Sequence, residues 1–498
     1  MRTSPSRPSG CEVTSASGLC ELTIAECAER IRARTLSPVD LTRAYLDRIV
    51  ELNPAVNAYI TVLRDEALES AHAAEAGLAA ERHPGPLYGV PIAVKDLFAS
   101  KGHRTTCGSR ILEDNVTSFD ATAVARLRQA GCVLLGKLTM SEFALGDDVN
   151  PLTGVGPTRN PWDLERSCSG SSSGSGAAVS ASLCAAALGT DTGGSIRLPA
   201  GFCGIVGMKP TFGRVSRHGV TPLAWSLDTA GPMTRTVEDN AIVLQAIAGA
   251  DPLDASCSGE PVPDYRASLA AGAKGLRVGL PKRYFLEYAA VDTAEAVREA
   301  AKTLERLGAT VYEVDLPHCK YALGAEYAII FTESLAYHAK YLRQGKFDLY
   351  TAASKVNWDA GRLISAADYT QAQRLRRFLI RDFEKAYGKV DVIFTPSTGI
   401  EASSIREEQA PGGAPARAVP AGHVTPGEMS WRMPSPANLA GVPTLALPCG
   451  FSREGLPLGL QIMGRHWDEA TVYRAGAAYE RATDWHTRRP KFLHMSRR

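Results

Sequence analysis

The 498-residue sequence lacks the features that mark several common classes of protein. No apolar run reaches about 18 residues, so we expect no membrane-spanning helix and no membrane partner. Arg2 and Arg7 are followed by no apolar segment, so we also expect no secretory signal peptide. The net charge is only +2 and Lys and Arg do not cluster, which argues against a nucleic-acid partner.

The cysteines lack the spacing of metal sites and of disulfide frameworks. There are eleven, an odd number, and Cys132, Cys184 and Cys449 lie within apolar runs. No C-x-x-C pair or other spacing typical of zinc ligands is present, so we expect no metal. We therefore predict free thiols in a reducing compartment and a cytoplasmic protein.

Strand and helix patterns alternate along almost the whole chain. Thr23, with Glu26 three residues later, predicts a capping box at the start of a helix, and Ser37 before Pro38 predicts the start of the next. Further helices are expected at 64–80, 121–130, 237–248, 293–307, 320–344, 365–387 and 469–483. Strands are expected at 92–94, 133–136, 213–216, 276–280, 310–314, 390–394, 442–447 and 456–462.

This alternation predicts an α/β fold with helices on both faces of a sheet. We expect a disordered segment at 1–21 and a single domain over 22–498. Within that domain we distinguish N-terminal helices (22–80), a core (85–250) that would carry the chemistry, and a more helical insertion (about 318–430). The insertion ends in a stretch, 398–429, whose Pro, Gly, Ala and Ser predict a long irregular loop.

Two segments rich in glycine and serine, 170–176 and 190–195, flank an apolar segment at 177–188. Glycines let the backbone turn sharply and approach a ligand, and serines supply hydroxyl groups that can attack or relay protons. The apolar segment predicts a buried helix packed against the sheet. A flexible linker would not alternate with core residues, so we disfavour that interpretation.

Lys95 directly follows the apolar strand pattern at 92–94. A lysine at such a position either extends its ammonium group to solvent or is buried with a lowered pKa. Position alone favours the exposed alternative.

Three chemical interpretations of the glycine and serine segments compete. Residues 170–174 match G-x-S-x-G, which would make Ser172 the nucleophile of a hydrolase elbow with His423, His466 or His486 as base. A phosphate cradle is disfavoured, because neither Gly-Lys-Ser/Thr nor G-x-G-x-x-G is present. In the third, both segments and Lys95 form one site: backbone N–H groups at 192–195 surround an oxyanion, Ser195 attacks, and neutral Lys95 is the base.

The sequence resembles the amidase signature family over about residues 22–485. Lys95 and Ser171 are 76 positions apart, and Ser171 and Ser195 are 24 apart, as in that family. The matching motifs, in the family's order, are 89–96 (GVPIAVKD), 160–163 (NPWD), 170–175 (GSSSGS), 189–197 (GTDTGGSIR), 226–232 (SLDTAGP) and 438–443 (NLAGVP).

The resemblance implies a large central mixed sheet covered by helices on both faces, and a Ser–cis-Ser–Lys triad. Ser195 would be the nucleophile, Ser171 the bridging serine after a cis bond from Gly170, and Lys95 the base. The implied reaction passes through an acyl-enzyme and needs no metal or organic cofactor. The implied oxyanion hole consists of the N–H groups of Thr192, Gly193, Gly194 and Ser195, and the implied supporting residues are Ser172, Asp191 and Arg197. The sequence departs from the family at Cys168-Ser169 and at Ser173, where Pro-Gly and Gly are common.

The family includes amidases, carbamate hydrolases and the glutamine-hydrolysing component of the tRNA amidotransferase. In that component an Asp shortly before the P-x-N-L-A-G motif would hold the amino group of glutamine, whereas residues 431–433 here are Trp, Arg and Met. We therefore expect a bulky or aromatic small-molecule amide or carbamate, which makes the chain a urethanase candidate, in a monomer or homodimer. An aryl ester or anilide hydrolase and an amidotransferase component with partners remain alternatives. The expected substrate pocket consists of Phe143, Leu145, Trp225 and Trp431.

Overall fold

A computed structural model describes residues 16–79, 85–148, 152, 156–408 and 430–492. Eleven strands form one mixed sheet, and β4 (Arg159–Asn160) pairs with β5 (Asp163–Ser167) apart from it. The spatial order of the large sheet is β1 (Tyr59–Val62), β3 (Val133–Leu138), β2 (Pro91–Lys95), β6 (Ala186–Asp191), β8 (Thr229–Thr234), β7 (Val206–Lys209), β12 (Thr444–Phe451), β13 (Pro457–Gly464), β11 (Val392–Pro396), β9 (Arg277–Pro281) and β10 (Thr310–Val314).

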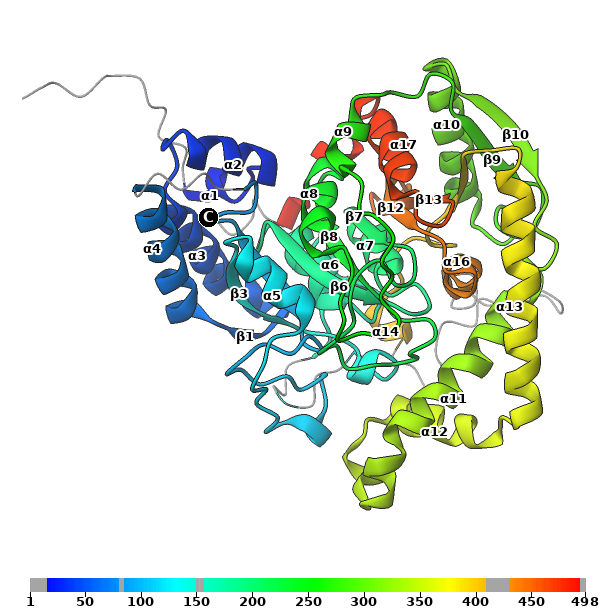
Figure 1. Cartoon of the computed structure of the whole chain (residues 1–498), viewed down its shortest axis with the longest axis horizontal. Coiled ribbons are helices and arrows are strands. Elements are labelled where there is room, and N and C mark those ends of the chain that lie inside the picture. The colour runs from blue at the N-terminus through cyan, green and yellow to red at the C-terminus, as the bar shows by residue number, and fades with distance from the viewer. Residues whose placement is uncertain (1–15, 80–84, 149–151, 153–155, 409–429, 493–498) are drawn as a thin grey trace, which may run out of the picture.

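Helices cover both faces of this sheet (Figure 1). The N-terminal helices lie at one side of the molecule in that view, and the long helices α11 to α13 lie at the other. The helices are α1 (Ala16–Leu19), α2 (Ile24–Arg32), α3 (Pro38–Val56), α4 (Arg64–Ala79), α5 (Thr122–Gln129), α6 (Ser173–Ser180), α7 (Arg197–Cys203), α8 (Val237–Ile247), α9 (Tyr265–Leu269), α10 (Val291–Arg306), α11 (Ala322–Arg343), α12 (Ala352–Leu363), α13 (Ala366–Tyr387), α14 (Ile405–Glu408), α16 (Ser435–Ala440) and α17 (Glu469–Arg481).

Strand direction brings a catalytic candidate, Lys95, and a predicted supporting residue, Asp191, to one edge of the sheet. β2 runs parallel to β6, with Val94 opposite Leu188, so Lys95 and Asp191 both end their strands at the same edge. β6 pairs antiparallel with β8, which places Thr229 opposite Asp191. In open α/β sheets, ligands bind beyond the carboxyl ends of parallel strands, and the glycine-rich loop after β6 lies there.

Most of the expected elements are present. Thr23 and Glu26 form the predicted capping box of α2, and the Ser37 hydroxyl accepts hydrogen bonds from the N–H groups of Val39 and Asp40 at the start of α3. The β9–α10–β10 unit and the paired strands β12 and β13 lie within a few residues of their predicted positions. α12 lies between the two long predicted helices and was not expected.

Three expectations were wrong. The segment 177–188 is not one helix, because α6 ends at Ser180 and β6 begins at Ala186; Ser182 turns the chain between them with a φ of +55°. Residues 213–216 form no strand, only an isolated bridge from Val215 to Ala248. The disordered segment does not extend to residue 21, because α1 is present and the buried Cys20 carbonyl accepts a hydrogen bond from Tyr45; residues 1–15 lie outside the described part.

The cysteines match their prediction where the structure describes them. No disulfide joins two of the ten described cysteines, and nine of them are buried. In the described part of the chain, no helix is both long enough and apolar enough to span a bilayer.

Candidate active site

Lys95 lies at the centre of the site, at the end of β2. Its side chain is fully buried, and its Nζ donates hydrogen bonds to Ser171 Oγ at 2.7 Å and to Thr190 Oγ1 at 3.0 Å. Burial lowers the pKa of the ammonium group to about 7. The expectation of an exposed ammonium was wrong, because β2 lies between β3 and β6 and its end opens into the protein interior.

Ser171 lies opposite Lys95 in the turn before α6. The peptide bond between Gly170 and Ser171 is cis, and the Ser171 carbonyl accepts a hydrogen bond from the Ser141 N–H at 3.3 Å. A Cβ at position 170 would lie 2.4 Å from the Ser141 hydroxyl, so any other residue there would have to displace that hydroxyl.

Ser172 has a different environment from that of a nucleophile. Its Oγ donates to the Thr190 carbonyl at 3.2 Å and accepts from the Thr190 N–H at 3.3 Å, so it joins α6 to β6. His466 donates to the Ala440 carbonyl at 2.8 Å, and His423 lies outside the described residues. This geometry does not support a hydrolase elbow centred on Ser172.

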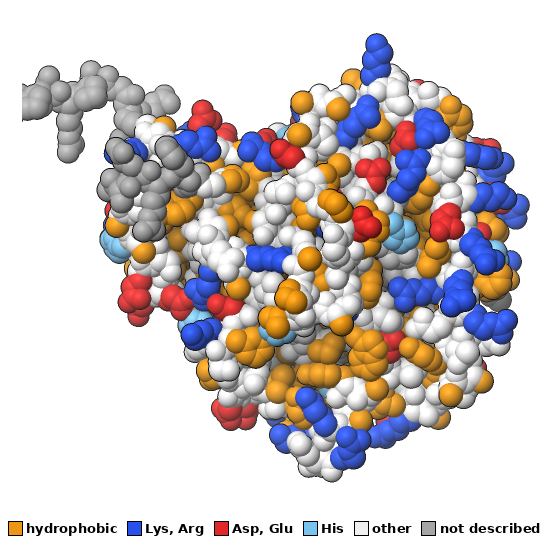
Figure 2. Space-filling model, viewed as in Figure 1, with side chains coloured by type: hydrophobic (Ala, Val, Ile, Leu, Met, Phe, Trp, Pro, Cys, Tyr) orange, Lys and Arg blue, Asp and Glu red, His pale blue; other side chains and the backbone are white. Residues whose placement is uncertain are grey.

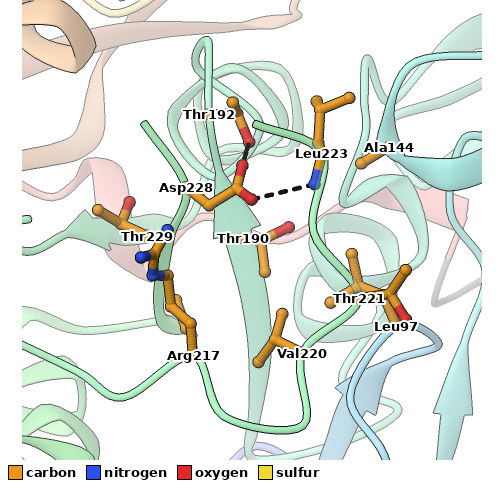
Figure 3. Close-up of a pocket in the computed structure, with 11 residues that line it drawn as sticks. Leu97, Ala144, Thr190, Thr192, Arg217, Val220, Thr221, Leu223, Asp228 and Thr229 are labelled. Carbon is orange, nitrogen blue, oxygen red and sulfur yellow. Dashed lines mark hydrogen bonds between the residues drawn. The ribbon is translucent and has the colours of Figure 1, made fainter. Parts of the chain in front are cut away.

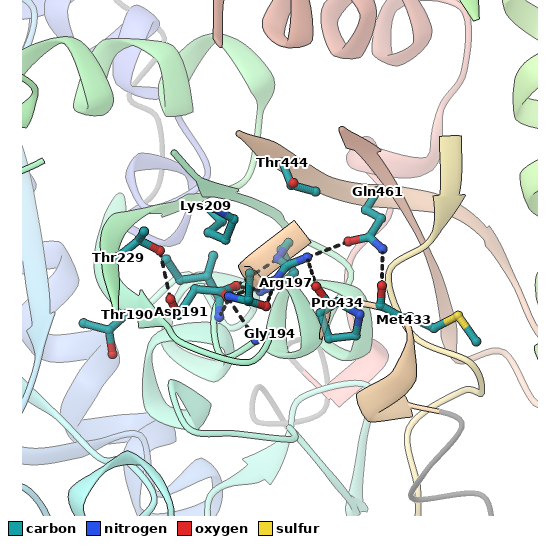
Figure 4. A network of polar contacts seen from close by, with 12 residues as sticks. Thr190, Asp191, Gly194, Arg197, Lys209, Thr229, Met433, Pro434, Thr444 and Gln461 are labelled. Atoms are coloured by element: carbon teal, nitrogen blue, oxygen red, sulfur yellow. Dashed lines mark hydrogen bonds and ion pairs between the residues drawn. The ribbon is translucent and has the colours of Figure 1, made fainter. Parts of the chain in front are cut away.

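A buried ion pair holds the loop after β6 (Figure 4). Asp191 accepts hydrogen bonds from the N–H groups of Gly194 at 2.9 Å and Ile196 at 3.2 Å, and from Arg197 Nε at 3.0 Å. Burial alone would raise the pKa of Asp191, but the Arg197 guanidinium and the Asn438 amide hold it below its usual range. The predicted supporting roles of Asp191 and Arg197 are consistent with these contacts.

The guanidinium of Arg197 also ties this loop to the C-terminal part of the sheet. It donates to the Pro434 carbonyl at 3.1 Å and to Gln461 Oε1 at 2.9 Å, and it contacts Asn438 Oδ1 (Figure 4). Asn438 in turn donates to Asp191 at 2.7 Å. Three segments far apart in the sequence therefore fix the position of residues 192–196.

The hydrogen bond from Gly194 corrects one detail of the expected oxyanion hole. Because the Gly194 N–H donates to Asp191, it is not available to a ligand in this conformation. No described residue accepts a hydrogen bond from the N–H of Gly193 or Ser195. The Ser195 hydroxyl also has no hydrogen-bond partner among the described residues, so the structure joins Lys95 to Ser171 but shows no bond from Ser171 to Ser195.

A small cavity lies beside Thr190 and Thr192 (Figure 3). Asp228 closes one wall, where it accepts hydrogen bonds from Thr192 Oγ1 at 2.6 Å and from the N–H groups of Leu223 and Ala224 at 3.0 Å each. Burial raises the pKa of Asp228. The other lining residues are Leu97, Ala144, Arg217, Val220, Thr221, Thr229 and Ala230.

The four expected pocket residues do not line this cavity. Phe143 is buried, and its ring lies edge-on to that of His338 at 4.4 Å, whereas its neighbour Ala144 lines the cavity. The Leu145 carbonyl accepts a hydrogen bond from Asn357. Trp225 is 46% exposed, and the Trp431 carbonyl accepts a hydrogen bond from the Ser435 hydroxyl.

The turn that carries Phe143 is anchored to the helical insertion. Glu142 accepts hydrogen bonds from the Thr351 N–H at 2.8 Å and the Ser354 hydroxyl at 2.6 Å, at the start of α12. Phe143 itself has a φ of +47°, which is uncommon for a residue with a bulky side chain. The insertion therefore positions the Ala144 wall of the cavity.

Several residues of the site were not singled out from the sequence. Asn438 and Asp228 lie within motifs that carried the family resemblance, so their signal was present. Gln461 is a single polar residue within the apolar strand β13, a pattern that indicates a buried hydrogen-bonding role. Thr190 carried no signal beyond its place beside Asp191.

The model of the family described as Amidase matches residues 40–473. The chain is 43% identical over 494 residues to the A component of the glutamyl-tRNA(Gln) amidotransferase of Geobacter metallireducens, covering 95% of this chain and 99% of that one. Its structure is similar to the peptide amidase from Stenotrophomonas maltophilia, with a TM-score of 0.80, 34% identity and coverage of 95% and 99%. A bacterial aryl acylamidase of the amidase signature family gives a TM-score of 0.83, with 28% identity and coverage of 95% and 98%.

The chain therefore belongs to the amidase signature family. It is an enzyme that acts on the C–N bond of amides, and its large mixed sheet with helices on both faces is the fold of that family.

Proposed function

We propose that this chain hydrolyses a small-molecule amide through an acyl-enzyme on Ser195, with Ser171 as proton relay and Lys95 as base. The observation that carries the proposal is the 2.7 Å hydrogen bond between Lys95 Nζ and Ser171 Oγ inside a fully buried site. With a pKa of about 7, a substantial fraction of Lys95 is neutral at neutral pH and can accept a proton.

We propose the following proton transfers. Lys95 takes the Ser171 proton as Ser171 takes the Ser195 proton, and Ser195 Oγ bonds to the substrate carbonyl carbon. The relay then returns a proton to the substrate nitrogen, the C–N bond breaks and the amine leaves. Water, deprotonated by the same relay, attacks the ester carbonyl and releases the acid, which restores the Ser195 hydroxyl.

The developing oxyanion would lie against the loop after β6. The N–H groups of Gly193 and Ser195 have no acceptor among the described residues and are the strongest candidates, with Thr192 beside them. Asp191 and Arg197 act indirectly, because their ion pair holds the loop in place before substrate arrives. A preorganised donor pair is worth more than one that must be assembled during the reaction.

The substrate is proposed to be apolar or aromatic and to lack a free amino group beside the reacting carbonyl. Residues 431–433 offer no carboxylate that could pair with an ammonium group. Hydrophobic side chains gather in a hollow of the surface beside α11 and α12 (Figure 2). A carbamate would react through the same steps, so a urethane hydrolase is included. We further propose a cytoplasmic monomer or homodimer that needs no partner chain.

One observation favours a second candidate. The 43% identity to the amidotransferase component extends over nearly the full length of both chains. Under this alternative, the chain would release ammonia from an amide only when joined to partner chains.

Hydrolysis by the purified chain tests both candidates. The panel presents one aromatic acyl group as a primary amide, an anilide and an aryl carbamate, together with glutamine. We expect turnover of an aromatic compound, little turnover of glutamine, and loss of at least about a thousandfold in rate in Ser195→Ala. Wild-type turnover that persists in Ser195→Ala would overturn the nucleophile, and glutamine as the preferred substrate would favour the amidotransferase component.

A further inference from the structure

Glu326, on α11, is a buried carboxyl group behind the loop that carries the proposed oxyanion donors. Its side chain is fully buried, and a Cβ placed on Gly193 would lie 3.3 Å from the Glu326 carboxyl carbon. Ile330, one turn further along α11, would lie 3.4 Å from the same point. The carboxyl group therefore packs directly against the backbone of Gly193.

The hydrogen bonds around Glu326 favour a protonated carboxyl group. Ser435 Oγ is in hydrogen-bond contact with two acceptors, the Trp431 carbonyl at 2.8 Å and Glu326 Oε2, and it has a single hydroxyl hydrogen for the two. A neutral Glu326 resolves this shortage, because its own hydrogen can then serve the contact with Ser435 while the serine hydroxyl donates to Trp431. The other oxygen, Oε1, is buried without a hydrogen-bond partner among the described residues, which is costly for a carboxylate and much less so for the carbonyl oxygen of a neutral acid.

The charges around Glu326 are consistent with a neutral acid. Burial raises the pKa of Glu326 to about 8, whereas the hydrogen bond from Ser435 and the charge of Arg197 lower it and Asp191 raises it. Arg197 and Asp191 form an ion pair with each other, so their effects on the pKa of Glu326 oppose one another.

The remaining described helices and loops packed against α11 bring no opposite charge to this carboxyl. α16 (Ser435–Ala440) contains no ionisable residue, and Tyr284 on the loop after β9 donates to the Arg432 carbonyl at 3.1 Å. Tyr369 on α13 donates to Glu333 at 2.9 Å, and Arg376 on the same helix faces Glu333 as well. α12 meets α11 at His338, where the Trp358 ring lies 4.2 Å from the imidazole and is tilted by 30° against it.

We infer that Glu326 is a positioning residue that must stay neutral, and that its ionisation sets the alkaline limit of the reaction. This inference rests on the proposed function. A neutral carboxyl behind Gly193 leaves the Gly193 N–H free to stabilise an oxyanion, whereas a carboxylate would place a second negative charge against the same loop. Because the unpartnered oxygen is buried and does not line the cavity, an ammonium-binding role fits the geometry less well.

The first test is the pH dependence of kcat/KM for a neutral aryl amide. With Lys95 titrating near 7 and Glu326 near 8, wild type should rise and then fall, because each pH unit above the acid's pKa lowers the neutral fraction about tenfold. In Glu326→Gln, which keeps the shape and removes the titration, we expect the fall between pH 8 and 9.5 to disappear. An alkaline fall that persists in Glu326→Gln, or a wild type without one, overturns the inference.

Glu480 on α17 is a matched control. Burial also raises the pKa of its carboxyl to about 8, but it accepts hydrogen bonds from the Val237 N–H at the start of α8, apart from the site. Glu480→Gln should leave the alkaline fall unchanged. If Glu326→Gln instead raised KM only for substrates that carry an amino group, Glu326 would be part of an ammonium-binding site. That result would contradict a positioning role.

Infrared spectroscopy tests the protonation without turnover. At pH 7 the carbonyl stretch of protonated carboxylic acids should be stronger in Glu480→Gln than in the double variant that adds Glu326→Gln, because other buried acids such as Asp228 contribute equally to both. If Glu326→Gln does not fold, the titration of this band in Glu480→Gln decides, since its midpoint must coincide with the alkaline fall. Equal bands in the two variants at pH 7 overturn the inference, whatever the activity of the chain.

Discussion

Two fully buried lysines each end a strand of the large sheet, Lys95 on β2 and Lys209 on β7. They differ in what they contact. Burial lowers the pKa of each to about 7. Lys95 donates to two hydroxyl groups, those of Ser171 and Thr190, whereas Lys209 donates to the Pro210 carbonyl at 2.9 Å. A hydroxyl can give up a proton to an amine and a carbonyl cannot. A lowered lysine pKa is therefore insufficient for base chemistry without a partner that has a proton to lose.

A third buried lysine, Lys137 on β3, extends the comparison. Its Nζ lies 3.1 Å from Asp96 Oδ1 and donates to the Phe98 carbonyl at 2.7 Å. An ammonium group paired with a carboxylate in this way has a structural role, because removal of either partner would leave a buried charge. All three lysines are buried, and Lys137 also donates to a hydroxyl, that of Thr105 at 2.9 Å, but only Lys95 contacts a hydroxyl of the glycine- and serine-rich segment 170–176.

A pair of matched substitutions tests the difference between Lys95 and Lys209 most directly. Lys95→Met should lower kcat by about a thousandfold or more, since general-base catalysis contributes about 10²–10⁴-fold and the relay has no other base. Lys209→Met, which removes an amine of similar burial, should retain the rate within a few-fold. Steady-state kinetics on the same amide, with thermal unfolding to verify the fold, measures both; equal losses in the two variants would contradict the assignment of Lys95.

The acid limb of the pH profile sharpens the comparison further. Lys95 must be neutral to act, so kcat/KM should fall about tenfold for each pH unit below about 7, on the opposite side of the profile from the alkaline fall assigned to Glu326. Lys209 titrates in the same range but contacts no reacting group, so the acid limb should be the same in Lys209→Met. If the acid limb moved or disappeared in Lys209→Met, the titrating group would be Lys209, and its assignment to Lys95 would be wrong.

The sequence could predict the identity of these groups better than their environment. Spacing and motifs brought Lys95, Ser171 and Ser195 together, yet position alone favoured an exposed Lys95, because no local pattern tells that β2 is flanked by β3 and β6. Likewise the run of Ala, Ser and Leu at 177–188 suits a helix or a buried strand, and Ser182 adopts a positive φ without the glycine that would have indicated a turn. The contacts of Arg197 with Pro434 and Gln461 span more than 230 positions, which no local pattern contains.

The smallest effect concerns the second hydroxyl on Lys95. Thr190→Val keeps the shape of the side chain but removes the oxygen that accepts a hydrogen bond from Nζ. Because an ammonium group gains more from an acceptor than a neutral amine does, its loss should lower the pKa of Lys95 further. The acid limb should then move to lower pH by less than about one unit, since one hydrogen bond contributes about 1 kcal/mol, while kcat falls a few-fold as the amine is held less firmly.

Thr190→Ser is the matched control for that shift, because it restores the hydroxyl and removes only a methyl group. We expect its acid limb to coincide with that of wild type. If Thr190→Val and Thr190→Ser both leave the limb in place, the Ser171 contact alone would determine the titration of Lys95. The difference from Lys209 would then depend on a single hydroxyl, the one that the proposed relay uses, and the second hydroxyl would serve only to hold β6 beside β2.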